Sequence, residues 1–164
     1  MNPAHLLSAT LLLTGACRAQ SDAEAGPSER SCTLGTGSTL FEPLHSGDSV
    51  GIVYGPQGGF HVWGTYRATG IDPGDYYDTA APDNPTSIFN VYLSDHTRVG
   101  GSAPIRLGLK VRSDGTMEHV GEPVILGISD PEEIAYATAT ITVEVVDANG
   151  DTVTDERDVV LVPE

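Results

Sequence analysis

The residues best suited to binding a hard cation are four aspartates within one short segment, residues 71–85. They are Asp72, Asp75, Asp78 and Asp83. Carboxylate oxygens are preferred ligands of calcium, so these four side chains are the candidate metal ligands. Their spacing matches no calcium-binding loop, and a solvated acidic loop is the competing interpretation of the same residues.

The histidines carry a second metal hypothesis, a copper or zinc site that uses His61. The four histidines that follow the N-terminal leader are His45, His61, His96 and His119. None lies two or four residues from another, the spacing that places two ligands together on a strand or a helix. Met117 and His119 alternate on one expected strand, so they could reach His61 only through tertiary contact.

Motifs for nucleophilic or phosphate chemistry are incomplete. The glycine-rich run 55–59 lacks the Lys-Ser/Thr pair of a phosphate-binding loop and is typical of a hairpin turn. Ser102 lacks the second glycine of a nucleophile elbow, and no carboxylate pair is singled out for glycoside hydrolysis. The sequence therefore predicts a protein that is not an enzyme and needs no cofactor, with a small hydrolase as a third hypothesis.

Residues 60–69 give the strongest indication of a binding surface. Apolar and small residues occupy every second position, and this face suits a core. The alternate positions place His61, Trp63 and Arg67 together on the opposite face. Trp and Arg are frequent anchors of protein partners, so an open face here would bind a partner or a ligand. Alternatively, Trp63 packs inward or is covered by a loop.

Strands must position these residues, because apolar residues alternate with a period near two from residue 38 onward. The clearest strand is 105–112, which turns at 113–115 into a partner at 117–120. Further strands are predicted at 39–44, 49–54, 60–69, 87–94 and 123–128. The capping Asp130 before a proline and two glutamates predicts one helical turn.

The C-terminal hairpin, which turns at residues 147–151, has two possible registers. A two-residue turn would place Glu144 opposite Asp155, and two like charges in contact are unfavourable. A three-residue turn pairs Val145 with Val153 and keeps the apolar faces together, so we predict this register.

Seven or eight strands without helical spacers indicate the fold class. We predict an all-β domain over 32–164, an antiparallel immunoglobulin-like β-sandwich. A small barrel or jelly roll is the alternative. The sequence has two cysteines, too few for a scaffold that depends on disulfides.

The N-terminus is typical of an export signal. Residues 6–13 are apolar but too few to span a bilayer, and small residues precede Cys17. The run Leu13-Thr14-Gly15-Ala16-Cys17 resembles a bacterial lipobox, in which the cysteine thiol receives a diacylglycerol and becomes the mature N-terminus. The resemblance implies a signal peptide over 1–16 and a lipidated Cys17. The alternative is an ordinary secretory signal, which would leave the protein secreted or periplasmic.

Residues 17–31 are expected to form the lipidated end and a flexible tether. Residues 18–31 contain no large apolar side chain that could offset the entropy of ordering them. Residue 18 is arginine, whereas aspartate there would favour retention in the inner membrane, so the outer membrane is the expected location. If Cys17 is acylated, Cys32 is a small buried residue of the first strand; otherwise the two could form a disulfide.

A family resemblance rests on several segments between residues 33 and 75. They are Leu34–Gly37, Phe41–Leu44, Gly47-Asp48, Gly55–Val62 and Arg67. The Gly-Pro-Gln-Gly-Gly-aromatic-His pattern within them resembles a set of uncharacterised lipoproteins of Gram-negative bacteria. The resemblance implies an envelope lipoprotein and no finer function.

The charge balance completes the prediction. Asp and Glu number 23 against 8 Lys and Arg, a net charge of −15, which would repel nucleic acid. We therefore predict a non-enzymatic cell-envelope lipoprotein, held on a membrane through Cys17, whose β-sandwich binds an envelope protein or ligand or has a structural role. The alternative is an envelope domain that binds calcium, copper or zinc.

Overall fold

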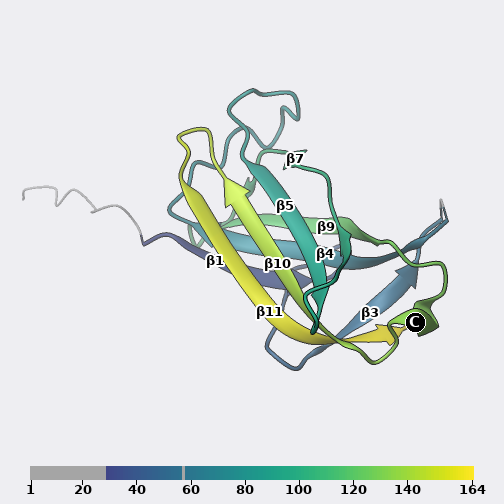
Figure 1. Ribbon diagram of the computed structural model, residues 1–164. Coiled ribbons are helices and arrows are strands. Elements are labelled where there is room, and N and C mark those ends of the chain that lie inside the picture. The colour runs from purple at the N-terminus through teal and green to yellow at the C-terminus, as the bar shows by residue number, and fades with distance from the viewer. Residues whose placement is uncertain (1–28, 57) are drawn as a thin grey trace, which may run out of the picture.

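The computed structural model describes residues 29–56 and 58–164, and these residues form an all-β fold (Figure 1). The strands are β1 (Ser31–Thr36), β2 (Glu42–Pro43), β3 (Ser49–Tyr54), β4 (Phe60–Thr69), β5 (Thr86–Leu93), β6 (Arg98–Gly101), β7 (Ile105–Arg106), β8 (Lys110–Val111), β9 (Met117–Leu126), β10 (Thr138–Val146) and β11 (Thr152–Pro163). The predicted all-β class is confirmed. In this part of the chain, no helix reaches the length and apolar character that crossing a bilayer requires.

The strands form two crossed layers that are hydrogen-bonded to each other at both edges. One layer contains β1, β4 and β9, and β5, β10 and β11 cross in front of it (Figure 1). The pairings run from β4 through β3, β11, β10, β5, β6 and β9 and return to β4, so they close a ring. The ladders are antiparallel except for β3 with β11, which is parallel.

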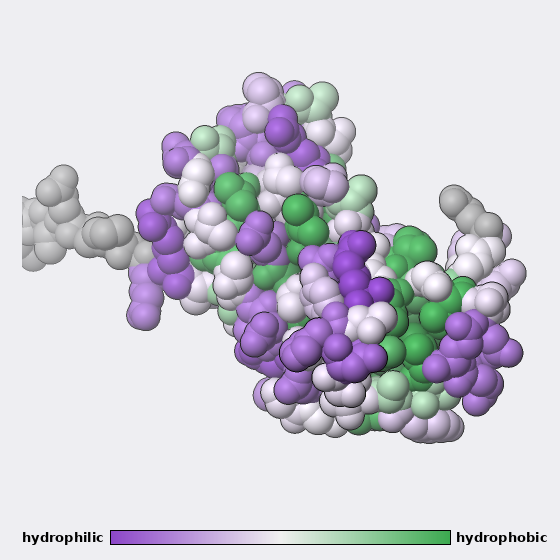
Figure 2. Space-filling model, in the orientation of Figure 1, coloured by the Kyte–Doolittle hydropathy of each residue, from purple (hydrophilic) through white to green (hydrophobic). Residues whose placement is uncertain are grey.

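The core lies between the layers and is built as the alternation in β4 predicts. Val62, Tyr66 and Ala68 are buried. Gly64 belongs to the same face, and a Cβ there would approach the Phe89 ring to 2.8 Å. Glycine at this position therefore makes room for the phenyl ring from the opposite layer. Figure 2 shows charged and polar residues over much of the surface, with apolar residues reaching it near β3 and the C-terminus.

The strand expected over 105–112 is broken, and this prediction is wrong. Only β7 and β8 form there, two residues each. The backbone of the 71–85 loop crosses at Gly108, where any Cβ would clash with the carbonyl of Asp75. Leu107 and Leu109 donate their N–H groups to this loop, at Pro85 and Pro73, instead of to a neighbouring strand. The backbone groups are satisfied without extending the sheet.

The C-terminal hairpin has the predicted register. Val145 lies opposite Val153, and the Asp147 N–H donates to the carbonyl of Asp151 at 3.0 Å. Gly150 has φ of 82°, a conformation that glycine adopts without strain. The predicted helical turn is also present, as the 3₁₀ helix η1 (Pro131–Glu133), which Asp130 caps.

The N-terminal segment meets the domain before β1 begins. Arg30 forms an ion pair of 2.6 Å with Asp151 in the β10–β11 turn. Thr69 Oγ1 donates to the carbonyl of Glu29 at 2.7 Å. Residues 29–31 of the expected tether therefore lie against the domain, whereas Cys17 and the expected signal peptide lie outside the described residues.

Candidate functional site

The face of β4 that was expected to carry His61, Trp63 and Arg67 is open only in part. The His61 ring meets the Trp63 ring edge-on, with 4.6 Å between centroids. His61 itself is 5% exposed, and its Nε2 has no hydrogen-bond partner among the described residues. Burial lowers the pKa of His61, because the charged imidazolium would lose its hydration. Trp63 is partly buried and remains the accessible member of this pair.

Arg67 lies away from that pair and is covered by a segment that precedes β4 in the sequence. The 37–41 segment passes over β4 and β9, and a Cβ on Gly121 would clash with the carbonyl of Ser38. Phe41 packs over the Arg67 guanidinium at 4.4 Å. Of the two interpretations of this face, an open surface or a surface covered by a loop, the position of the 37–41 segment favours the second around Arg67. A binding role for His61, Trp63 or Arg67 stays a prediction.

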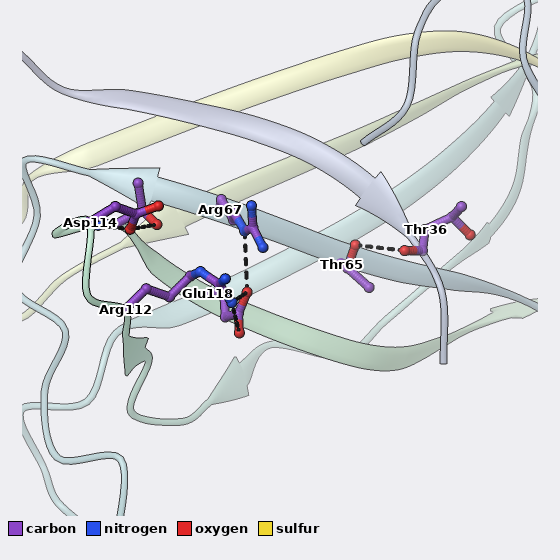
Figure 3. A network of polar contacts seen from close by, with 7 residues as sticks. Thr36, Thr65, Arg67, Arg112, Asp114 and Glu118 are labelled. Atoms are coloured by element: carbon purple, nitrogen blue, oxygen red, sulfur yellow. Dashed lines mark hydrogen bonds and ion pairs between the residues drawn. The ribbon is translucent and has the colours of Figure 1, made fainter. Parts of the chain in front are cut away.

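Arg67 instead belongs to an ionic network centred on Glu118 (Figure 3). Glu118 is 8% exposed. It accepts from Arg67 Nε at 3.2 Å and from Arg112 Nη1 at 2.8 and 2.9 Å. Charge-assisted bonds of this kind satisfy a carboxylate that burial would otherwise penalise. Asp114 lies close by, and hydrogen bonds from the Thr116 hydroxyl and N–H lower its pKa, with a smaller contribution from Arg112.

The four aspartates of the 71–85 loop do not converge on one point. Three of them accept backbone N–H groups of their own loop: Asp72 from Gly74, Asp75 from Tyr77 and Asp78 from Ala80. Asp83 is exposed. Within residues 29–56 and 58–164, no three His, Cys, Asp or Glu side chains are grouped closely enough to hold a metal ion.

The histidine arrangement considered for copper or zinc is also dispersed. Strand pairing places His61 opposite Ile125 and His119 opposite Tyr66, so the two imidazoles lie at different levels of the β4–β9 ladder. His119 stacks on Tyr66 and lies 3.5 Å from the Glu122 carboxylate. These contacts leave the two histidines in separate surroundings.

The aspartates shape a loop that holds two tyrosines in solvent beside a hollow. Tyr76 is 49% exposed and Tyr77 is 93% exposed. Their rings meet edge-on at 5.3 Å. The hollow measures about 700 Å³ and lies between this loop, the 107–110 segment, the residues after β1 and the start of β9. These residues come together only in the folded chain.

Cys32 lies in β1 with its thiol largely withdrawn from water. Burial raises the pKa of Cys32 to about 12, and the nearby Asp155 carboxylate acts in the same direction. A thiol with this pKa stays protonated and unreactive at neutral pH. Cys32 therefore behaves as a small packing residue.

Glu118 and Asn84 are the important residues that the sequence did not single out. Glu118 had a detectable signal, because the predicted hairpin places it diagonally across from Arg112, and oppositely charged diagonal pairs stabilise a sheet. Asn84 is 3% exposed and its amide bonds the backbone of Asp75 and Asp78. Nothing in the spacing of the sequence distinguishes it from a surface asparagine.

No protein-family model matches the chain, and no curated protein matches it. Among solved structures it is similar to the crystal structure of CopC from Methylosinus trichosporium OB3b, with 12% sequence identity and a TM-score of 0.31. The similarity covers 73% of this chain and 86% of that chain. A TM-score this low leaves the description of the fold to rest on the strand pairings themselves.

Proposed function

We propose that this protein is a lipid-anchored domain of the cell envelope, without catalytic activity, that binds a partner through the Tyr76–Tyr77 loop. The anchor follows from the lipobox-like run that ends at Cys17 and from the apolar stretch before it. Two or more acyl chains on that cysteine would hold the domain on a membrane.

The observation that carries the binding role is the exposure of two tyrosines on an internally braced loop. The Asn84 side chain accepts from the Asp75 N–H at 2.8 Å and donates to the Asp78 carbonyl at 2.8 Å. Asp75 Oδ1 accepts the N–H of Tyr77. A loop braced in this way keeps its aromatic rings in water, although burying them would be favourable. Rings held in place before binding also reduce the entropy that binding costs.

The polar groups around the hollow favour binding over catalysis. Glu118 is the buried carboxylate there, and two guanidinium groups occupy its oxygens. The oxygens of a carboxylate held in this way are already hydrogen-bonded, so they are not free to act on a substrate. In three of the loop aspartates, one oxygen, Oδ1, likewise accepts a backbone N–H group.

The anchor is tested by replacing the lipidation cysteine in the full-length protein and fractionating the cells. We expect Cys17→Ser to move the protein from the membrane fraction to the soluble fraction. Cys32→Ser is the matched control, because it removes the other cysteine and should leave the protein on the membrane. A Cys17→Ser protein that stays membrane-bound would disprove the anchor.

A further inference from the structure

We propose that the hollow beside Tyr76 and Tyr77 binds a neutral saccharide, so that the protein's partner is a glycan. This inference rests on the proposed function, because it names the ligand class for the same loop. The hollow combines two exposed aromatic rings with hydroxyl, ammonium and imidazole groups. The residues that matter are Thr39, Tyr76, Tyr77, Thr79, Lys110 and His119.

The tyrosines supply the apolar part of such a site. A pyranose ring has a face of C–H groups, which are weakly positive and fit the negative face of an aromatic ring. Because the rings of Tyr76 and Tyr77 meet at 80°, they present two differently oriented faces. Tyr77 is nearly fully exposed, so a sugar can reach its ring without displacing any part of the domain.

Other lining residues of the hollow supply groups that can bind sugar hydroxyls. The Thr39 and Thr79 hydroxyls both donate and accept, and Lys110 donates. These residues come from three different segments, the turn after β1, the 71–85 loop and β8. A ligand that contacts these polar groups as well as the tyrosine rings needs both hydroxyl groups and an apolar face, as a saccharide has.

Charge argues against anionic ligands. The loop carries four aspartates, and the whole chain has a net charge of −15. This field repels phosphate backbones and anionic lipid surfaces, whereas a neutral sugar is unaffected by it. Lys110 is the basic residue that lines the hollow, and its single positive charge is too small to reverse the surrounding negative charge.

The sheet architecture argues against an extended peptide. A peptide that adds to a sheet needs a long edge with unpaired backbone groups. The ring of pairings is closed, and β8, the strand beside the hollow, has only two residues. The loop is held to the 107–109 segment by two backbone hydrogen bonds, so those groups are also used.

The test is a titration of the soluble full-length Cys17→Ser protein with neutral tetrasaccharides, followed by NMR or calorimetry. Suitable probes are the tetramers of β-1,4-linked N-acetylglucosamine, β-1,4-linked glucose and α-1,4-linked glucose. We expect at least one of them to bind saturably, with a Kd of about 1 mM or tighter. Tyr77→Ala should weaken that binding about tenfold or more, because it removes the main stacking surface.

Tyr54→Ala is the matched control. Tyr54 is also exposed, at 65%, but it lies at the end of β3 and does not line the hollow. It should leave the affinity unchanged, and thermal unfolding of both variants checks that each is folded. An equal loss in the two variants would show that the stacking surface is elsewhere and overturn the site.

Two further outcomes would contradict the proposal that the ligand is a saccharide, and both would leave the proposed function unaffected. One is the absence of saturable binding to all three tetrasaccharides. The other is Tyr77-dependent sedimentation with vesicles of phosphatidylethanolamine and phosphatidylglycerol, which would identify a lipid surface as the partner. The anchor is tested separately by fractionation of Cys17→Ser cells, so its failure is distinguishable from a wrong ligand class.

Discussion

At the scale of single residues, the difficult predictions concern polar groups that become buried. The alternation in β4 correctly separates Val62 and Tyr66 from His61, but alternation alone cannot show what covers the second face. The cover comes from residues 37–41, whose position depends on the whole fold. Arg67 and Glu118 are 51 residues apart and meet only through the β4–β9 ladder. Contacts of this range have no local sequence signal.

Asp147 offers a prediction on pH at the same scale. Burial alone would raise the pKa of Asp147, but N–H groups of Asp72, Asp151 and Asn149 donate to its carboxylate, and the net shift is downward. A depressed folded-state pKa contributes stability above the unfolded pKa, about 3.9, and that stability is lost as the pH falls through the folded value.

Asp147→Asn should therefore lower the free energy of unfolding by about 1–2 kcal/mol at pH 7. The difference between the variant and the wild type should shrink as the pH falls below about 4. Urea titrations at several pH values measure both quantities. Glu156→Gln removes an exposed carboxylate and should match the wild type throughout. A difference for Asp147→Asn that stays constant down to pH 2 would contradict the linkage argument.

At the scale of elements, local pattern succeeds where neighbours in sequence pair with each other. The observed β3 and β4 have the predicted bounds, and the β10–β11 register follows from side-chain pairing across one turn. The failure at 105–112 has a different origin. Its alternation is as regular as that of β4, but the 71–85 loop takes its backbone hydrogen bonds. Tertiary contacts therefore prevent this segment from forming the continuous strand that its alternating pattern predicts.

Gly108→Ala tests whether that close approach holds the loop. A Cβ at residue 108 would clash with the Asp75 carbonyl and the Tyr76 nitrogen, which are both backbone atoms and cannot rotate away. We expect a loss of about 2 kcal/mol or more in the free energy of unfolding, together with a changed fluorescence of the adjacent tyrosines. Gly127→Ala is the control, because its nearest neighbour is 3.6 Å away. Equal stability of the two variants would show that the loop is not fixed by this contact.

At the scale of the whole molecule, the closed ring protects the sheet edges, and the net charge of −15 sets what can approach the surface. Fold class and net charge can be predicted from the sequence because each depends on many residues. A wrong prediction for one residue or strand barely changes either of them. The structure of the Tyr76–Tyr77 loop is not readable in this way. Its acidic residues suggest a cation site until their hydrogen bonds to backbone N–H groups are known.

A comparison of salts by thermal unfolding separates these two effects of acidity. Self-repulsion of a strongly negative chain is reduced by any electrolyte, so sodium chloride should raise the Tm. Calcium chloride at equal ionic strength should raise it no further, because the carboxylates of Asp72, Asp75 and Asp78 already accept N–H groups and do not converge. A rise in the Tm that is specific to calcium, saturates with calcium concentration and is abolished by Asp75→Asn would identify this loop as a calcium site. It would contradict the saccharide proposal.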